Sequence, residues 1–318
     1  MKTILTKIKF IYLVSFSIIF IGLSCTEIGI DDILERSNPN FNPRVETLIE
    51  NFPANDGLSI DVSGKLYASN FAGFRGTQVF KVNPKNSSII DSITGLRAPT
   101  GNVTDKFGNT YIVNNVRRIS TESQLLEGDV IKVSRDGIKT VFATLPGFPS
   151  GITLDNNGNL YVSNYAFQGV HKISNNGDVS IFARNPLLGG GVGIDFDDEN
   201  NLYVGNFVSG NIIKIDTANN ISVFATLPTV VNGTVIGYIT YGFNSIFATA
   251  IGENVIYKID MDGNASIFAG NKEQQTLDGN LLESSFNLPN GIVADEVRKV
   301  IYVSEASPDG SLRVIKLK

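Results

Sequence analysis

Short runs in which apolar and polar residues alternate fill most of the chain, and turns rich in Gly, Asp and Asn separate them. A period of two residues predicts half-buried β-strands. One set of runs recurs six times, at intervals of about 45 residues. A glycine opens each copy, at Gly57, Gly101, Gly151, Gly193, Gly237 and Gly291.

Each copy predicts four strands. The segment GITLDNNGNLYVSN contains the first two, and Asp155 with Gly158 between them is typical of a type I turn followed by a left-handed residue. The runs HKI and SIFA that follow predict the third and fourth strands. Four strands in each of six copies favour an all-β, six-bladed β-propeller with four antiparallel strands per blade over a two-sheet sandwich.

The two ends of the repeat region complement each other. The last copy has only three runs before the chain ends at Lys318, whereas an additional run, Val45 to Pro53, precedes the first copy. We therefore expect the N-terminal strand to pair with the stretch Leu312 to Leu317 and to complete the C-terminal blade. Such closure of the ring removes an exposed sheet edge. The predicted propeller domain spans residues 44–318.

The N-terminus has the pattern of an export signal in residues 1–24, where three lysines precede an apolar run that ends at Leu23. This run is short for a membrane span. The sequence Gly-Leu-Ser-Cys ending at Cys25 resembles a bacterial lipoprotein box, which implies lipidation of Cys25; an ordinary secretory signal is the alternative. Residues 25–43 are mostly polar and predict a tether. We expect an exported lipoprotein, on the periplasmic side or at the cell surface of the outer membrane.

Composition excludes several kinds of chemistry. The 318 residues include one Cys and one His, so neither a disulfide framework nor a His-rich zinc site is possible. The formal charge is −5. A nucleic-acid partner is not expected, because binding to its backbone requires a basic face. The single histidine, His171, aligns with apolar residues of the third strands and is expected to be packed in the interior.

The segments GITLDNNGNLYVSN and HKISNNGDVSIFA resemble the NHL repeat, and the six copies together resemble the propellers of the SMP-30/gluconolactonase-like group. The resemblance covers residues 44–318 and implies the fold derived above. It leaves the activity open, because this fold carries hydrolases as well as binding modules.

Metal-dependent members of the group take ligands largely from the residue before the opening glycine. In this sequence those positions hold Asp56, Thr100, Ser150, Val192, Ile236 and Asn290. Asp56 and Asn290 suit a divalent metal such as Ca²⁺, whereas Thr100 and Ser150 are weak ligands and Val192 and Ile236 offer no side-chain oxygen. A metal-dependent lactonase or esterase is thus one functional hypothesis.

Two polar residues interrupt the apolar first strands and could add metal ligands. Asn102 and Asp195 stand at positions that are mostly apolar or hydroxylated in the other copies. The alternative is that the innermost strands line a water-filled channel in which both side chains are solvated.

The ends of the second strands carry candidate ligand-binding residues. An asparagine occupies one aligned position in four consecutive copies, at Asn70, Asn114, Asn164 and Asn206. A ring of carboxamides suits a polar ligand such as a sugar or a lactone, although bonds from each side chain to nearby backbone would explain the pattern equally well. Arginines and aromatic residues follow, of which we select Arg75, Tyr165 and Phe207, because such side chains are enriched in binding surfaces.

The leading hypothesis is that the channel face binds a small polar ligand or a partner protein. Metal-dependent hydrolysis and a purely structural interaction module are the alternatives. No catalytic residue is assigned. The longest inserts predicted on this face, residues 115–128 and 270–290, are expected to contribute to function.

Overall fold

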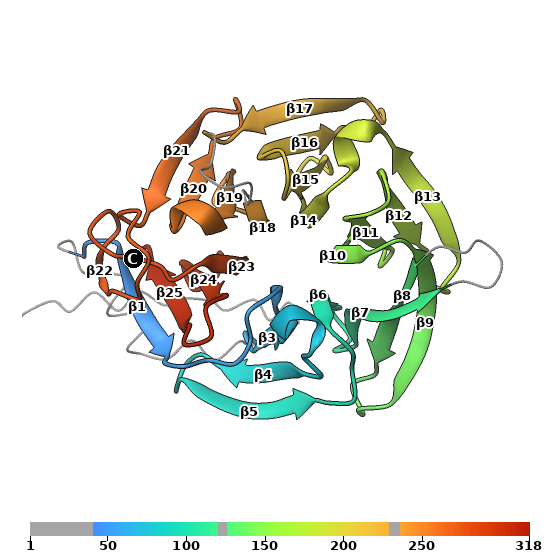
Figure 1. The fold of residues 1–318 in the computed structure, drawn as a ribbon, viewed down its shortest axis with the longest axis horizontal. Helices are drawn as coiled ribbons and strands as arrows, with labels where there is room; N and C mark the ends of the chain where they lie inside the picture. The colour runs from blue at the N-terminus through green and yellow to red at the C-terminus, as the bar shows by residue number, and fades with distance from the viewer. Residues whose placement is uncertain (1–40, 120–125, 229–235) are drawn as a thin grey trace, which may run out of the picture.

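The computed structural model describes residues 41–119, 126–228 and 236–318. Six β-sheets are arranged around a central axis as the blades of a propeller (Figure 1). The predicted all-β fold is therefore confirmed, and so is the count of six blades. Among the described residues, no helix reaches the length and apolar content needed to cross a membrane.

Five blades have four antiparallel strands each, which follow one another from the channel outward. Blade 1 comprises β2 (Leu58–Ile60), β3 (Leu66–Ser69), β4 (Val79–Asn83) and β5 (Ser88–Ile93). Blade 2 comprises β6 (Pro99–Thr104), β7 (Thr110–Ile119), β8 (Leu126–Val133) and β9 (Lys139–Pro146). Blade 3 comprises β10 (Pro149–Leu154), β11 (Leu160–Asn164), β12 (Gly169–Ile173) and β13 (Val179–Arg184). Blade 4 comprises β14 (Gly191–Phe196), β15 (Leu202–Asn206), β16 (Asn211–Ile215) and β17 (Ile221–Thr226). Blade 5 comprises β18 (Ile236–Gly242), β19 (Ser245–Ala250), β20 (Val255–Ile259) and β21 (Ala265–Ala269).

Blade 6 joins the two ends of the chain. Its strands β23 (Pro289–Asp295), β24 (Val300–Glu305) and β25 (Leu312–Lys316) are followed by the N-terminal β1 (Arg44–Ile49) and by a short fifth strand, β22 (Gly279–Asn280). Figure 1 shows β1 beside β25, where Arg44 is paired with Lys316 and Val45 with Ile315. The predicted closure is confirmed. The fifth strand was not predicted.

The described part of the chain also contains three short 3₁₀ turns: η1 (Ala72–Phe74), η2 (Pro186–Leu188) and η3 (Ile251–Glu253). In blade 3, Oδ1 of Asp155 accepts the backbone N–H groups of Asn157 and Asn159 at 2.9 and 2.8 Å, and Gly158 has φ +81°. The predicted turn between the first and second strands is thus confirmed.

The turns between the first and second strands of the blades define one face of the propeller, which we call the hairpin face. The opposite face, which we call the mouth face, carries the connections that enter each first strand and those that join each second strand to the third. The pairing of Pro149 with Asn164 shows that a first strand begins where the neighbouring second strand ends.

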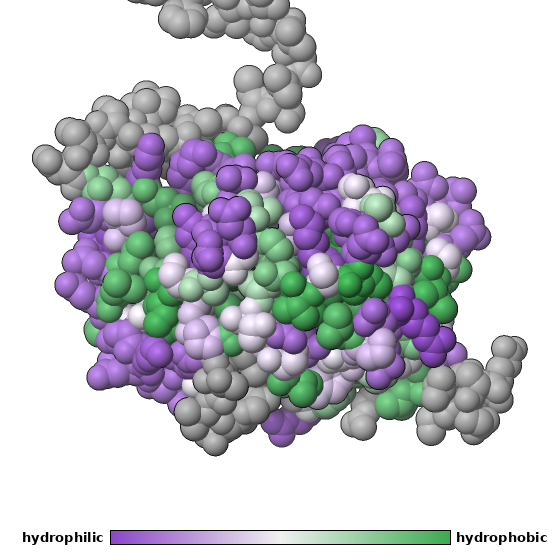
Figure 2. All heavy atoms as spheres, turned by 90° about the horizontal axis from the view of Figure 1, so that it is seen from above, coloured by the Kyte–Doolittle hydropathy of each residue, from purple (hydrophilic) through white to green (hydrophobic). Residues whose placement is uncertain are grey.

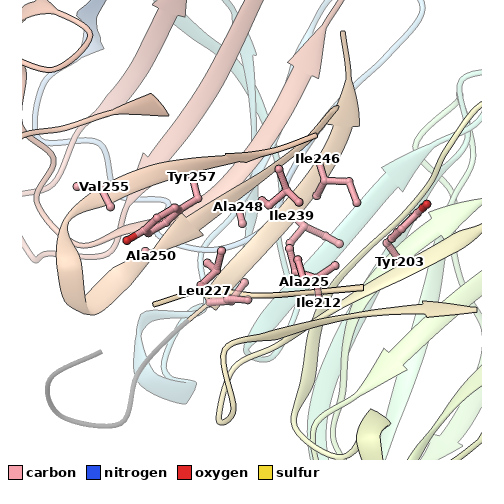
Figure 3. Packing of buried hydrophobic residues seen from close by; sticks show 12 residues of the cluster. Tyr203, Ile212, Ala225, Leu227, Ile239, Ile246, Ala248, Ala250, Val255 and Tyr257 are labelled. Carbon is pink, nitrogen blue, oxygen red and sulfur yellow. The ribbon is translucent and has the colours of Figure 1, made fainter. Parts of the chain in front are cut away.

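The hydrophobic core lies between adjacent blades. Figure 3 shows one such cluster, in which Tyr203, Ile212 and Ala225 of blade 4 pack against Ile239 and Ala248 of blade 5. Seen edge-on, the rim mixes polar and apolar side chains (Figure 2). In blade 3, His171 is 2% exposed and lies 4.6 Å from the ring of Phe167, as expected for a packed histidine.

The opening glycines allow the first strands to crowd around the channel. A Cβ atom on Gly151 would lie 2.0 Å from the carbonyl oxygen of Val192 in the next blade, and one on Gly101 would lie 2.5 Å from that of Ser150. Any larger residue would therefore force neighbouring blades apart, which accounts for the glycine at the start of every copy.

Candidate functional site at the mouth of the channel

The ring closure brings together Asp56 and Asn290, the two residues that suit a divalent metal. Nδ2 of Asn290 lies 3.4 Å from Oδ2 of Asp56 and donates to the backbone oxygen of Asn55 at 2.7 Å. Both residues stand directly before an opening glycine, Gly57 or Gly291. The two side chains therefore meet on the mouth face at the junction of blades 6 and 1.

A tyrosine of blade 5 reaches past blade 6 to contact Asp56. Tyr238 in β18 of blade 5 donates its hydroxyl to Oδ1 of Asp56 at 2.5 Å, and the backbone N–H of Gly57 donates to the same oxygen at 3.0 Å. Tyr238 was not predicted as a site residue. The signal was available, because the other copies hold an aliphatic residue or Asn102 at this position.

Burial determines the electrostatics of this pair. The loss of solvent raises the pKa of Asp56 to about 6, against the opposing effect of the bonds from Tyr238, Gly57 and Asn290. Burial, together with the nearby Asp56 carboxylate, raises the pKa of Tyr238 well above its usual range. Tyr238 is therefore a neutral donor at physiological pH, and the pair forms a strut between blades 5 and 1.

The residues present do not fit a divalent-metal site of the kind that the resemblance implied. Both oxygens of Asp56 face protein donors, and the hydroxyl of Thr100 donates to the Ser150 carbonyl at 3.0 Å. Val192 and Ile236 contribute no ligand side chain. No group of three or more His, Cys, Asp or Glu side chains in the described part of the chain is placed to hold a metal ion.

Asn102 is engaged inside the channel wall. Its Nδ2 donates to the carbonyl oxygen of Gly57 and to the hydroxyl of Ser69, both at 2.9 Å, and its Oδ1 accepts the hydroxyl of Ser59 at 2.5 Å. All three partners belong to blade 1. The side chain therefore ties blade 2 to blade 1, and its carbonyl oxygen is already occupied.

Asp195 lines a cavity of about 140 Å³ in the channel, together with Asn102 and Tyr238. Its carboxylate accepts the backbone N–H groups of Tyr241 and Phe196, both at 2.9 Å. The hydroxyls of two threonines complete its set of donors, Thr153 at 3.2 Å and Thr240 at 3.3 Å. Burial raises the pKa of Asp195 to about 6. These contacts favour a polar channel lining over a metal ligand.

The four aligned asparagines bond to the connection that enters their own blade. Asn70 donates to the Pro53 carbonyl at 2.6 Å, and Asn114 accepts the backbone N–H of Arg97 at 2.6 Å. Asn164 donates to the Pro146 carbonyl at 2.7 Å and accepts the N–H of Phe148 at 2.9 Å, and Asn206 donates to the Gly189 carbonyl at 2.7 Å. These contacts favour the structural alternative, and direct contact of the asparagines with a ligand stays a prediction.

Five aromatic rings form a continuous series on the mouth face, which we call the mouth arc: Phe71, Phe74, Phe148, Tyr165 and Phe207. Consecutive ring centroids lie 4.6, 5.5, 6.3 and 6.0 Å apart, all in edge-to-face geometry. Phe74 and Tyr165 are each 43% exposed. The arc thus presents accessible aromatic surface across blades 1 to 4.

The sequence selected Tyr165 and Phe207 but missed Phe148. This phenylalanine lies in the connection that enters blade 3, outside the aligned ends of the second strands. It joins the rings of blade 1 to those of blades 3 and 4, because it contacts both Phe74 and Tyr165. Its backbone N–H is held by Asn164.

The segment that carries Phe74 is conformationally strained. Ala72 and Phe74 have φ values of 45° and 72°, which residues other than Gly, Asn and Asp seldom adopt. Asn55 holds this turn, because its Oδ1 accepts the backbone N–H groups of Phe71 and Ala72 at 3.2 and 3.1 Å. Such strain persists where the surroundings impose it, often at binding sites.

No protein-family model matches the chain, and no curated protein sequence matches it. Solved structures share its fold. An auxiliary nutrient binding protein from Bacteroides thetaiotaomicron aligns with a TM-score of 0.70 and 16% identity, over 86% of this chain and 76% of that one. A gluconolactonase from Xanthomonas campestris aligns with a TM-score of 0.63 and 15% identity, over 87% and 90%. Virginiamycin B lyase from Staphylococcus aureus aligns with a TM-score of 0.57 and 19% identity, over 82% and 80%.

These likenesses define the class of protein as a six-bladed β-propeller. At such identities they establish the fold alone. Within that class, the chain has the architecture of the gluconolactonase-like propellers, and the resemblance seen in the repeats is confirmed at the level of the fold.

Proposed function

We propose that this protein is a non-catalytic binding propeller whose mouth arc binds a small ligand that has a flat face. The observation that carries the proposal is the unbroken series of five aromatic rings on one face. Aromatic side chains provide large contact area and are enriched in binding surfaces. Asn55 and Asn164 fix the backbone of the segments that carry Phe71 and Phe148.

Structural neighbours support binding as a function of this fold. Two of them are described as auxiliary nutrient binding proteins, from Bacteroides thetaiotaomicron and Bacteroides ovatus. Hydrolysis has weaker support in this chain, because Asp56 is engaged by Tyr238 and Gly57, and Asn102 and Asp195 are engaged elsewhere. A purely structural module would not require aromatic side chains to be exposed on the mouth face.

Ligand-observed NMR tests this proposal with a panel of mono-, di- and trisaccharides, sugar lactones and aromatic carboxylates. We expect saturation transfer to at least one compound with the wild-type protein and its loss in the Phe148→Ala/Tyr165→Ala variant. Phe107→Ala is the matched control, because Phe107 is 69% exposed and belongs to a turn on the hairpin face. Binding that survives the double replacement would refute the proposal.

We also propose that the exported chain is anchored through Cys25, which lies outside the described residues. In the closed ring, β1 starts at Arg44 opposite Lys316, on the hairpin face. A tether that enters there would leave the mouth arc pointing away from the membrane. Labelling of cells with a radioactive fatty acid should mark the wild-type protein and not Cys25→Ala, and equal labelling of both would exclude this anchor.

A further inference from the structure

Three arginines whose side chains the structure describes lie on the mouth face in the blades that carry the mouth arc. Arg75 directly follows η1, Arg97 lies in the connection from β5 to β6, and Arg184 ends β13. All three side chains are exposed. The topology therefore places three positive charges on the same face as the aromatic series.

None of these arginines has an acidic partner among the residues that the structure describes. Nε of Arg75 reaches only the Ala72 carbonyl, at 3.5 Å. The guanidinium of Arg184 lies 5.1 Å from the ring centroid of Phe167. Arg97 donates only its backbone N–H, to Oδ1 of Asn114, among the contacts of the described residues. Their guanidinium donors therefore remain available to a ligand.

Two acids on the mouth face of blades 5 and 6 form ion pairs with basic residues of the same blades. Glu253 forms an ion pair with Lys272 at 3.1 Å, and Glu305 forms one with Arg313 at 2.8 Å. Asp309 accepts the hydroxyl of Ser307. Glu50, which directly follows β1, forms no ion pair with the residues that the structure describes. The ion-paired acids of blades 5 and 6 therefore do not neutralise the three arginines.

We propose that the mouth arc and these arginines bind a ring compound that carries a carboxylate. The inference rests on the proposed function and specifies its ligand. A flat ring stacks on aromatic side chains, and the planar guanidinium of arginine binds a carboxylate through two parallel hydrogen bonds. A uronic-acid sugar and an aromatic carboxylate both have this chemistry.

A single-stranded nucleic acid also combines stacking bases with negative charge. The chain favours a smaller acid, because its formal charge is −5. Binding along a nucleic-acid backbone requires an extended basic surface. The nucleic acid is therefore one outcome of the test.

The test is isothermal titration calorimetry of the whole protein with trigalacturonate, neutral galactotriose, benzoate and a thymidine oligonucleotide. We expect trigalacturonate or benzoate to bind more tightly than galactotriose, and binding to weaken with added salt. Arg75→Gln/Arg97→Gln should reduce the affinity for the acid by about tenfold or more, since hydrogen bonds between charged groups are lost. Arg135→Gln, an exposed arginine in a turn on the hairpin face, should change nothing.

The outcomes separate this inference from the proposed function. If galactotriose binds as tightly as trigalacturonate and the arginine variant is unchanged, while Phe148→Ala/Tyr165→Ala still abolishes binding, the acidic ligand is wrong and the binding site stands. Tighter binding of the oligonucleotide than of either acid would also refute the proposal that the ligand is a ring compound with a carboxylate. If every ligand binds the arc variant and the wild type equally, both proposals fail. Binding of benzoate but not trigalacturonate would support the inference and identify the acid as aromatic.

Discussion

Arg313 and Glu305 form an ion pair of 2.8 Å, and neither side chain is exposed to solvent. Arg313 belongs to β25 and Glu305 ends β24, so the pair lies within the closing blade. The arginine also donates to the carbonyl oxygens of Ser285 and Leu277, and it contacts Asp278 at 2.9 Å. It therefore fastens the insert of residues 270–288 to the blade that closes the ring.

Replacing Arg313 should destabilise the fold strongly. We expect Arg313→Met to lower the free energy of unfolding by about 3–5 kcal/mol, because Glu305 would remain buried without its counter-charge. Urea denaturation followed by circular dichroism measures this change. The control is Arg44→Met, which breaks an exposed pair with Glu46 and should cost about 1 kcal/mol or less. Similar losses in the two variants would contradict this account of the insert.

Tyr238→Phe tests the strut across the channel. Removal of the hydroxyl deprives the buried Asp56 of its shortest hydrogen bond, and we expect a loss of about 1–3 kcal/mol in unfolding free energy. The pKa of Asp56 should rise further above about 6, because the bond from Tyr238 holds it down. Carboxyl ¹³C NMR measures this pKa. Tyr241→Phe removes a hydroxyl that binds the exposed Asp198, and it should leave the pKa of Asp56 unchanged.

The propeller and its closure were predictable because the alternation of apolar and polar residues within each repeat predicts the strands of that blade. The count of runs left one strand missing at the C-terminus and one in excess at the N-terminus, so β1 could be assigned to β25. The fifth strand β22 could not be predicted. Its two residues are held by contacts of the insert with Arg313, which do not recur in any other blade.

The candidate site was predictable only where it follows the repeat. Tyr165 and Phe207 occupy aligned positions, whereas Phe148 lies in a connection that varies between copies. The contact of Tyr238 with Asp56 joins blades 5 and 1, which are not neighbours in the ring. A repeat pattern along the chain cannot indicate a contact between blades that are not adjacent. Asn164 shows the opposite case, because its position was visible while its bond to the backbone of Phe148 required the structure.

His171 should make the protein sensitive to acid. Burial lowers its pKa to about 4, below the ordinary value of 6.5, so the folded state resists protonation. Above pH 6.5 His171 is neutral in both the folded and the unfolded state, and stability is unaffected. As the pH falls from 6.5 toward 4, the unfolded chain binds a proton at His171 that the folded state does not, and the free energy of unfolding decreases. The loss amounts to up to about 3 kcal/mol. In His171→Phe, which carries the residue found at Phe80 in blade 1, unfolding free energy should lose this dependence. An unchanged pH profile would contradict the prediction.

Asp195 should act in the opposite direction. Burial raises its pKa from 3.8 to about 6, so the folded state binds a proton more tightly than the unfolded chain does. The stability due to this proton is present below pH 3.8 and is lost as the pH rises through 6, by up to about 3 kcal/mol. Asp195→Asn should therefore gain stability relative to the wild type between pH 4 and pH 7. Denaturation at both pH values measures the difference, and a constant difference would exclude the effect.

Calcium titration discriminates between the binding propeller and the metal-dependent hydrolase. A Ca²⁺ site requires six to eight oxygen ligands. Asp56 already accepts Tyr238 and Gly57, and the equivalent positions in blades 4 and 5 are Val192 and Ile236. We therefore expect no micromolar binding of Ca²⁺ to the metal-stripped protein by calorimetry, and no difference between the wild type and Asp56→Ala. Micromolar binding that disappears in Asp56→Ala would instead support the hydrolase. The strut would then have to open to admit the ion, and Tyr238→Phe should increase the affinity.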